Sequence, residues 1–202
     1  MPDNTQESIR LFIKDWVNGK DSPHFAILIA GKWGCGKTHF IRNIQKDQCF
    51  TDCKSIYISL FGISSLDEFE KQLVFSSFSS TGRVALMNVG FFTNIFLKFI
   101  SLKTGGIFGG SGDYNKAQKM ILDMTKKWSD SINNAFIVID DLERCSFEYR
   151  DLLGSLNQYI EHGDARIVLV SNTKKLMIRG LTNFIRKLLA KISRCQVITL
   201  PQ

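Results

Sequence analysis

The sequence has few cysteines, and their spacing does not fit a zinc or redox motif. Five cysteines occur among 202 residues, an odd number, and no two of them form a C-x-x-C pair. These features argue against a disulfide-stapled secreted domain and against a cysteine metal site. The segment 1–20 also lacks the basic start and apolar run of a secretory signal, and its pattern instead predicts an amphipathic helix over 4–18. We therefore expect a cytoplasmic protein with free thiols.

Acidic residues are scarce near the C-terminal end. Between residues 163 and 202, Asp164 is the only acid against eight basic residues, so this part carries the whole net charge of +7. Lys175, Arg179 and Arg186 recur there at helical spacing. The resulting positive stripe fits either a nucleic-acid contact or an ordinary solvated helix face.

The segment 82–112 contains no acidic residue and ends in a glycine-rich stretch. Its apolar part, 84–102, approaches the length of a membrane span, but Asn88, Asn94 and Lys98 lie inside it, and such groups are costly in hydrocarbon. Three interpretations fit: a spanning helix, a hairpin that docks on a membrane surface or a partner, and a pair of core helices followed by a glycine loop. We predict that this segment is an insertion into the domain.

At 202 residues and 44% hydrophobic content, the chain is long enough to bury the core of one domain. Hydrophobic periodicity predicts alternating strands and helices, which is typical of an α/β fold with a parallel sheet covered on both faces, a three-layer α-β-α sandwich. The predicted strands are 24–30, 55–60, 135–139, 166–170 and 196–200. After the first helix, the predicted helices are one from Thr38, then 66–78, 115–131, 148–161 and 174–191. Ser65 and Glu68 have the spacing of a capping box at the start of 66–78.

A phosphate-binding loop follows the first predicted strand. Residues 31–38 are G-K-W-G-C-G-K-T, which matches the spacing G-x-x-x-x-G-K-[ST]. The glycines let backbone N–H groups wrap around a phosphate, and the following helix turns its positive end toward that charge. Lys37 can reach the β- and γ-phosphates, and the Thr38 hydroxyl is a hard oxygen ligand of the kind Mg²⁺ prefers. We therefore predict that the nucleotide is bound by Gly31, Lys32, Trp33, Gly34, Cys35, Gly36, Lys37, Thr38 and His39.

Two carboxylates, Asp140 and Asp141, end the apolar run 136–139. A buried strand of this kind delivers acids to the carboxyl edge of the sheet, where ligands bind. We predict that Asp140 holds Mg²⁺, usually through water, and that Asp141 orients and deprotonates the attacking water. Glu143 is the second candidate for this base, and Arg144 either contacts phosphate or pairs with Glu143 or Asp140.

The fourth predicted strand is followed by the polar residues Ser171, Asn172 and Thr173. Asn172 is a candidate catalytic residue, because at the same sheet edge it could hydrogen-bond the γ-phosphate or the attacking water. Its alternative role is to cap the following helix.

Taken together, these residues resemble one family. The sequence is similar to the KAP group of P-loop NTPases, relatives of the STAND and AAA+ ATPases, through Trp33 in the loop, the stretch D-D-L-E-R-C at 140–145, and the ending with Lys187, Ile192 and the strand 197–201. The resemblance spans nearly the whole chain. Its D-D-L-[DE]-R-C part is more specific than the phosphate-binding loop, which many proteins share.

The resemblance implies ATP as the nucleotide, a five-stranded parallel sheet in the order 5-1-4-3-2, and an insertion that often carries transmembrane helices, here 82–112. Bacterial members include proteins implicated in phage exclusion, so the resemblance implies a defence role. Glu143 stands where the family more often has Asp, and the chain stops at Gln202, where members usually continue into a helical lid. Because related ATPases complete their sites from a lid or a neighbouring subunit, we expect turnover to depend on an oligomer or a partner protein. Arg194 lies where AAA+ relatives carry an arginine finger, and a surface arginine is the alternative.

Three functions are compatible with the sequence. The first is a Mg²⁺-dependent ATPase that forms the switch or motor core of a larger assembly. The second is a weakly hydrolysing module in which ATP locks a conformation that exposes the insertion or the basic C-terminal helix to a partner, or that associates with a membrane. The third, which we expect less, is nucleic-acid binding through the basic end.

Overall fold

The computed structural model describes residues 4–19, 25–47, 53–77, 126, 130–133, 135–162, 164–172 and 196–199. Strands and helices alternate along them, as the sequence predicts. The strands are β1 (Ile27–Gly31), β2 (Ser55–Ser59), β3 (Phe136–Asp140), β4 (Arg166–Asn172) and β5 (Gln196–Thr199). The helices are α1 (Asn4–Asn18), α2 (Lys37–Lys46), α3 (Leu66–Ser77) and α7 (Tyr149–His162), with a 3-10 turn η2 (Leu142–Arg144).

The strands form one parallel sheet in the order β2-β3-β4-β1-β5. The order 1-4-3-2 of the first four strands confirms that part of the predicted topology. The register aligns Gly31 with Asn172 across β1 and β4, and Ser59 with Asp140 across β2 and β3. Because parallel strands end at the same edge, this register brings the phosphate-binding loop, the acidic pair and Asn172 together.

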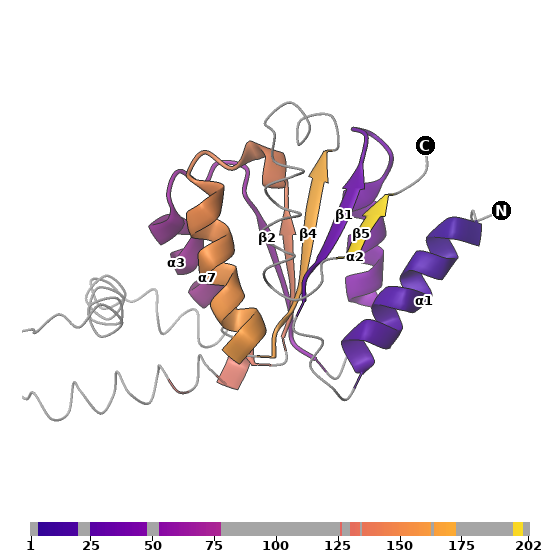
Figure 1. The fold of residues 1–202 in the computed structure, drawn as a ribbon, viewed down its shortest axis with the longest axis horizontal. Coiled ribbons are helices and arrows are strands. Elements are labelled where there is room, and N and C mark those ends of the chain that lie inside the picture. Colours follow the sequence, from indigo (N-terminus) through magenta and orange to yellow (C-terminus); the bar gives the residue numbers. More distant parts are fainter. Residues whose placement is uncertain are drawn as a thin grey trace, which may run out of the picture.

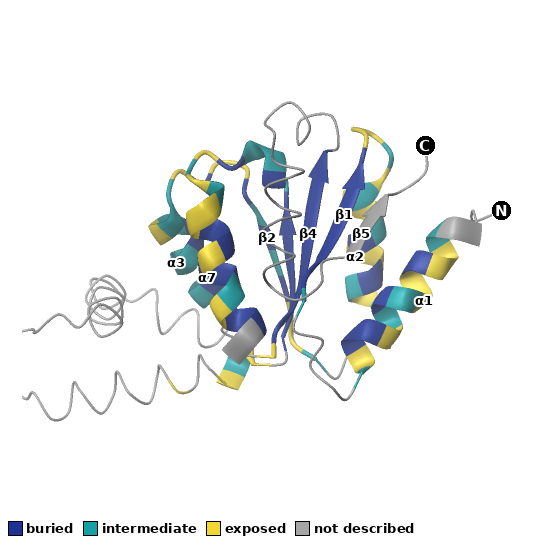
Figure 2. Cartoon of the chain, in the orientation of Figure 1, coloured by how far each residue is buried: buried dark blue, intermediate teal, exposed yellow. Residues whose placement is uncertain are grey.

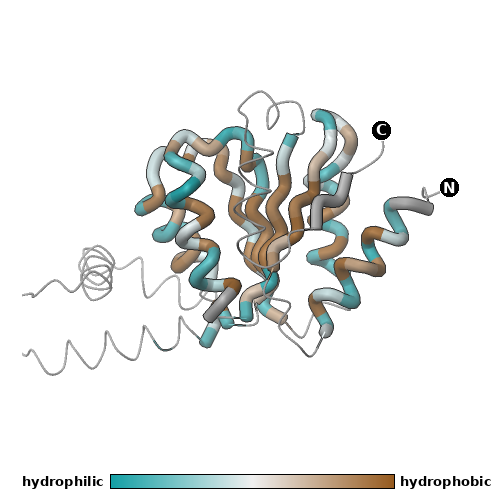
Figure 3. Tube along the Cα trace, viewed as in Figure 1, coloured by the Kyte–Doolittle hydropathy of each residue, from teal (hydrophilic) through white to brown (hydrophobic). Residues whose placement is uncertain are grey.

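The sheet lies between two helical layers, with α1 and α2 on one face and α3 and α7 on the other (Figure 1). The strands β1, β3 and β4 are buried along their whole length (Figure 2). They also form the most hydrophobic part of the fold, and the two faces of the sheet are therefore both core faces (Figure 3).

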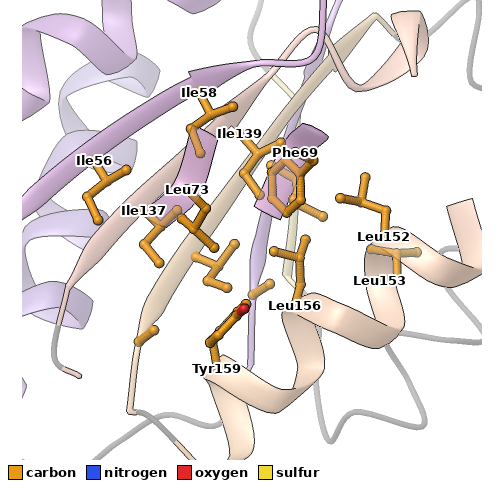
Figure 4. Close-up of a cluster of buried hydrophobic side chains, with 14 of the residues drawn as sticks. Ile56, Ile58, Phe69, Leu73, Ile137, Ile139, Leu152, Leu153, Leu156 and Tyr159 are labelled. Carbon is orange, nitrogen blue, oxygen red and sulfur yellow. The ribbon is translucent and has the colours of Figure 1, made fainter. Parts of the chain in front are cut away.

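Alternation along β3 divides its side chains between two hydrophobic clusters. Phe136 and Val138 pack with α1 and α2, whereas Ile137 and Ile139 pack with α3 and α7. Figure 4 shows the second cluster, in which sheet residues meet Phe69, Leu73, Leu152, Leu156 and Tyr159. Asp140 lies two residues after Val138, and side chains two positions apart share one face of a strand. The Asp140 side chain therefore lies on the face that carries α2.

Three strands end later than the sequence predicts. β1 ends at Gly31 and β4 at Asn172, because these two residues pair with each other, and β3 includes Asp140. The predicted helix 174–191, the insertion 82–112 and most of the predicted helix 115–131 lie outside the described residues. Within the described part of the chain, no helix has the length and apolar character needed to cross a membrane.

Arg166, at the start of β4, is buried and fastens α1 to the sheet. Its guanidinium donates to the carbonyl oxygens of Trp16 at 3.1 Å and Gly19 at 2.6 Å. A cation at this end of a helix satisfies carbonyls that the helix leaves unpaired and interacts favourably with the helix dipole. Arg166, one of the eight basic residues of 163–202, thus has a structural role.

The start of α3 confirms the predicted capping box, with one difference. The backbone N–H of Glu68 donates to Ser65 Oγ at 3.2 Å. The Glu68 carboxylate, however, accepts hydrogen bonds from the backbone N–H and the hydroxyl of Ser64, both at 2.8 Å. These two bonds hold the pKa of Glu68 below its usual value, the backbone bond being the larger cause.

Candidate functional site

The phosphate-binding loop connects β1 to α2 and depends on glycine for two reasons. Gly36, which immediately precedes α2, has φ of 84°, a left-handed conformation that favours glycine. At Gly31 the reason is space, because a Cβ there would lie 2.7 Å from Sγ of Cys35. The tip of the loop is exposed, and it is visible beyond the end of β1 in Figure 2.

Lys37 is folded back onto this loop. Its ammonium donates to the carbonyl oxygens of Gly31 at 2.9 Å and Lys32 at 2.8 Å. Both acceptors are neutral, whereas phosphate oxygens are charged and form stronger hydrogen bonds with an ammonium. The predicted phosphate contact therefore requires Lys37 to exchange these carbonyls for the ligand.

The two sequence motifs meet at Thr38 and Asp140, which are 102 positions apart in the chain. The Thr38 hydroxyl donates to Asp140 Oδ2 at 2.7 Å. Asp140 is 3% exposed, and its other oxygen, Oδ1, accepts the backbone N–H of Asp141 at 2.7 Å. The two residues predicted to hold a metal are therefore in direct contact.

Tyr57, which belongs to neither sequence motif, also contacts Asp140. The Tyr57 hydroxyl, on β2, donates to Asp140 Oδ2 at 2.7 Å. Burial raises the pKa of Tyr57 to about 12, and the hydrogen bond to Asp140 and its charge contribute to the rise. Tyr57 lies two residues before Ser59, so the two side chains lie on the same face of β2. Only the pairing of β2 with β3 shows that the Tyr57 side chain faces Asp140.

Asp141 is the residue predicted to act as the base, and two side chains hold it. It adopts a left-handed conformation with φ of 57° directly before the turn η2. Its Oδ2 accepts the Ser59 hydroxyl at 2.8 Å, and its Oδ1 lies 3.2 Å from Arg144 Nε. Arg144 thus pairs with Asp141 and not with Glu143 or Asp140, because the 3-10 turn places residues three apart on one side.

Glu143, the second candidate for the base, extends toward the end of β4. Its Oε2 accepts the backbone N–H of Asn172 at 2.9 Å and the hydroxyl of Ser171 at 3.1 Å. Asn172 is 6% exposed. The loop after β3 is therefore connected through Glu143 to the end of β4, which carries the candidate catalytic residue Asn172.

These groups surround one cleft with a volume of about 310 Å³. Its lining includes most of the predicted site residues: Trp33, Gly34, Gly36, Lys37, Thr38, His39, Asp140, Asp141, Glu143, Arg144 and Asn172. Gly31, Lys32 and Cys35 belong to the loop without lining the cleft, and Arg194 lies outside the described residues.

The cleft has donor groups that suit Mg²⁺. A hydroxyl and a carboxylate oxygen converge at Thr38 and Asp140, and Mg²⁺ prefers hard oxygen ligands. Among the described residues, no group of three or more His, Cys, Asp or Glu side chains could hold a metal. Magnesium in nucleotide sites needs no such group, because phosphate oxygens and waters complete its coordination.

A second cleft, of about 430 Å³, adjoins the first at Arg144 and Trp33. Its other lining residues are Phe61, Gly62, Ile63, Ser64 and Ser146. Trp33 and Phe61 are 74% and 67% exposed, and the Arg144 guanidinium lies over both rings. Arg144 therefore lies at the junction of the first cleft and an aromatic surface.

Solved structures share this fold at low sequence identity. A chain of Drosophila ORC bound to GC-rich DNA and Cdc6 has a TM-score of 0.52 and 12% identity, with 98% of this chain and 29% of that chain covered. The complex with AT-rich DNA gives 0.50 at the same identity and coverage. Cdc6p from Pyrobaculum aerophilum gives 0.46 and 12%, covering 98% and 45%.

The chain thus spans less than half the length of these structures. Identity this low shows a common fold and no common function. No curated protein matches the chain. A family model for the KAP family P-loop domain matches residues 9–187. Since this match covers most of the chain and includes both motifs of the cleft, the protein belongs to the KAP family of P-loop NTPases.

Proposed function

We propose that this chain is a Mg²⁺-dependent ATPase that acts as the switch or motor core of a larger assembly. The observation that carries the proposal is the 2.7 Å hydrogen bond between Thr38 of the phosphate-binding loop and Asp140 at the end of β3. It brings a phosphate-binding motif and a carboxylate motif into one cleft. The complete five-stranded sheet in the order 5-1-4-3-2 is part of this proposal, and the pairing of β5 with β1 supports it.

The loop 31–38 binds the phosphates through its backbone N–H groups, and Lys37 supplies a charge to the β- and γ-phosphates. Thr38 and Asp140 would hold Mg²⁺, and the ion would supply positive charge beside the phosphates. Asp141 lies beside this position and takes the proton of the attacking water. Asn172 orients that water or the γ-phosphate from the end of β4.

Asp141 fits the role of base better than Glu143 does. Both line the cleft, but Glu143 Oε2 already accepts two hydrogen bonds from the end of β4. Asp141 is held at its two oxygens by a hydroxyl and by an arginine that is partly exposed to solvent. An arginine can leave such a pair when a triphosphate offers it a more highly charged partner.

The assembly and its role rest on the family resemblance. The ORC chains occur in complexes with DNA and Cdc6, but at 12% identity they share only the fold with this chain. In a larger assembly, Arg194 would serve as an arginine finger for a neighbouring subunit. Phage exclusion is the biological role that family resemblance supports, and contact with a membrane through 84–102 is part of the same hypothesis.

The second candidate is a nucleotide-locked interaction module with weak hydrolysis. Two observations favour it: the base candidate Asp141 is paired with Arg144, and Lys37 is bound to loop carbonyls. Both contacts must break before turnover, so a chain that lacks a partner would hydrolyse slowly.

ATP hydrolysis measured across a protein concentration series with Mg²⁺ tests the proposal. Lys37→Ala serves as the blank because it removes the phosphate contact. Specific activity that rises with concentration supports a site completed between subunits. Binding of ATP without turnover at every concentration supports the interaction module instead.

A further inference from the structure

Asp140 Oδ2 receives two hydrogen bonds from different elements. One comes from Thr38 on α2 and the other from the Tyr57 hydroxyl on β2, each at 2.7 Å. Neither the phosphate-binding motif nor the acidic motif includes Tyr57. Its hydroxyl is therefore a contact to the predicted metal ligand that the proposed function does not yet use.

The Tyr57 ring is fixed by a second contact. The Arg42 guanidinium lies 3.9 Å from the centre of the ring, a geometry in which a cation is attracted to the aromatic face. Arg42 stands one helical turn after Thr38 on the same face of α2. One helix thus contacts Asp140 directly through Thr38 and indirectly through Arg42 and Tyr57.

The position of Tyr57 in the sheet makes this arrangement specific. Tyr57 aligns with Val138 in the parallel pairing of β2 and β3, two residues before Asp140. Its side chain packs with the cluster on the α1 and α2 face, where the Asp140 side chain also lies. Phenylalanine would preserve this packing but could not donate to the carboxylate.

We propose that Tyr57 is a positioning residue for the magnesium ligand Asp140, and that Arg42 holds its ring in place. This inference rests on the proposed function, because it assigns a role toward the metal that Thr38 and Asp140 would hold. Groups that hydrogen-bond a metal-binding carboxylate fix its orientation, and their removal commonly lowers metal affinity by about 10- to 100-fold. The Mg²⁺ requirement of ATP binding should therefore depend on the Tyr57 hydroxyl.

The test is calorimetric binding of ATP to wild-type protein and Tyr57→Phe at increasing Mg²⁺ concentration, with a parallel titration in EDTA. We expect the Mg²⁺ concentration that gives half of the enhancement in ATP affinity to rise by about 10-fold or more in Tyr57→Phe. ATP affinity in EDTA should not change, because the phosphate-binding loop is intact. The same Mg²⁺ dependence in both proteins would overturn the inference.

Tyr149→Phe is the matched control. The Tyr149 hydroxyl donates to the carbonyl oxygen of Leu142 at 3.0 Å, next to the same loop but away from Asp140. This variant should keep the wild-type Mg²⁺ dependence, and an equal shift in both variants would mean that loop packing explains the effect. Arg42→Ala keeps the Tyr57 hydroxyl and should shift the dependence in the same direction by less; no shift would overturn the role of Arg42.

The outcomes separate this inference from the proposed function. If Mg²⁺ does not enhance ATP binding to the wild-type protein, both are wrong. If Mg²⁺ enhances binding equally in the wild type and in Tyr57→Phe, the proposed function stands and only the role of Tyr57 is rejected.

Discussion

Arg144 Nε lies 3.2 Å from Asp141 Oδ1, and the same guanidinium lies 4.6 Å from the centre of the Phe61 ring and 5.3 Å from that of Trp33. The residue thus connects the proposed base with the tip of the phosphate-binding loop. We therefore expect a ligand that contacts Arg144 in the cleft to change the ion pair of Asp141.

Asp141→Asn should abolish turnover while it leaves ATP binding intact. The amide keeps the size of the side chain but cannot accept a proton, and loss of a general base typically lowers the rate by about 10²–10⁴-fold. Steady-state hydrolysis and ATP titration measure the two effects. Ser59→Ala is the control, because it removes the hydroxyl that binds Asp141 Oδ2 and keeps the carboxylate. Wild-type turnover in Asp141→Asn would reject Asp141 as the base.

Substitutions of Glu143 distinguish a structural role from a catalytic one. Glu143→Gln keeps an oxygen that can accept from Ser171 and Asn172, so we expect most of the turnover to remain. Glu143→Ala leaves the buried backbone N–H of Asn172 without this acceptor, and we expect a loss of about 1–3 kcal/mol in the free energy of unfolding. Urea denaturation measures the loss. If Glu143→Gln is as inactive as Asp141→Asn, Glu143 has a catalytic role.

Arg166→Met should destabilise the fold. Methionine keeps much of the aliphatic length of the side chain but removes the donors to Trp16 and Gly19 at the end of α1. Hydrogen bonds from a charged group contribute about 1.5–3 kcal/mol, and we expect a loss of this size. Lys46→Met, at an exposed position of α2, should change the unfolding free energy by less than about 0.5 kcal/mol. Equal stability of Arg166→Met and wild type would contradict the capping role.

Glu68→Gln should remove a pH-dependent contribution to stability. The pKa of Glu68 is lowered in the folded protein from an ordinary value of 4.5. A carboxyl group whose pKa is lower in the folded protein than in the unfolded chain stabilises the fold at pH values above its unfolded-state pKa. This contribution is lost as the pH falls through the folded-state pKa. Wild-type protein should therefore exceed Glu68→Gln in stability at neutral pH, and the difference should shrink in acid. A difference that stays constant with pH would show that the charge of Glu68 is irrelevant.

The sequence predicts the strands and the cleft because both depend on local patterns. Apolar runs give the buried strands, and the fixed spacing of the glycines, Lys37 and Thr38 gives the phosphate-binding loop. The parallel sheet then places Asp140 beside that loop, since all strands end at one edge.

The contact of Asp141 with Arg144 and the contact of Asp140 with Tyr57 could not be predicted in the same way. Arg144 reaches Asp141 because Asp141 is left-handed and the turn η2 follows it, and no pattern in the sequence specifies that backbone. Tyr57 reaches Asp140 through the register of β2 with β3, which is set by tertiary packing. The hydrogen-bond partner of a polar side chain on a half-buried strand cannot be assigned until the neighbouring strand and its register are known.

The most direct test of the account is an ATP titration of wild-type protein and Asp140→Asn, each in Mg²⁺ and in EDTA. If Thr38 and Asp140 form one magnesium site beside the phosphate-binding loop, Mg²⁺ will tighten ATP binding to the wild type and have little effect on Asp140→Asn. The two proteins will bind ATP equally in EDTA. Full enhancement by Mg²⁺ in Asp140→Asn would contradict the account, because the two motifs would then not act on a common metal.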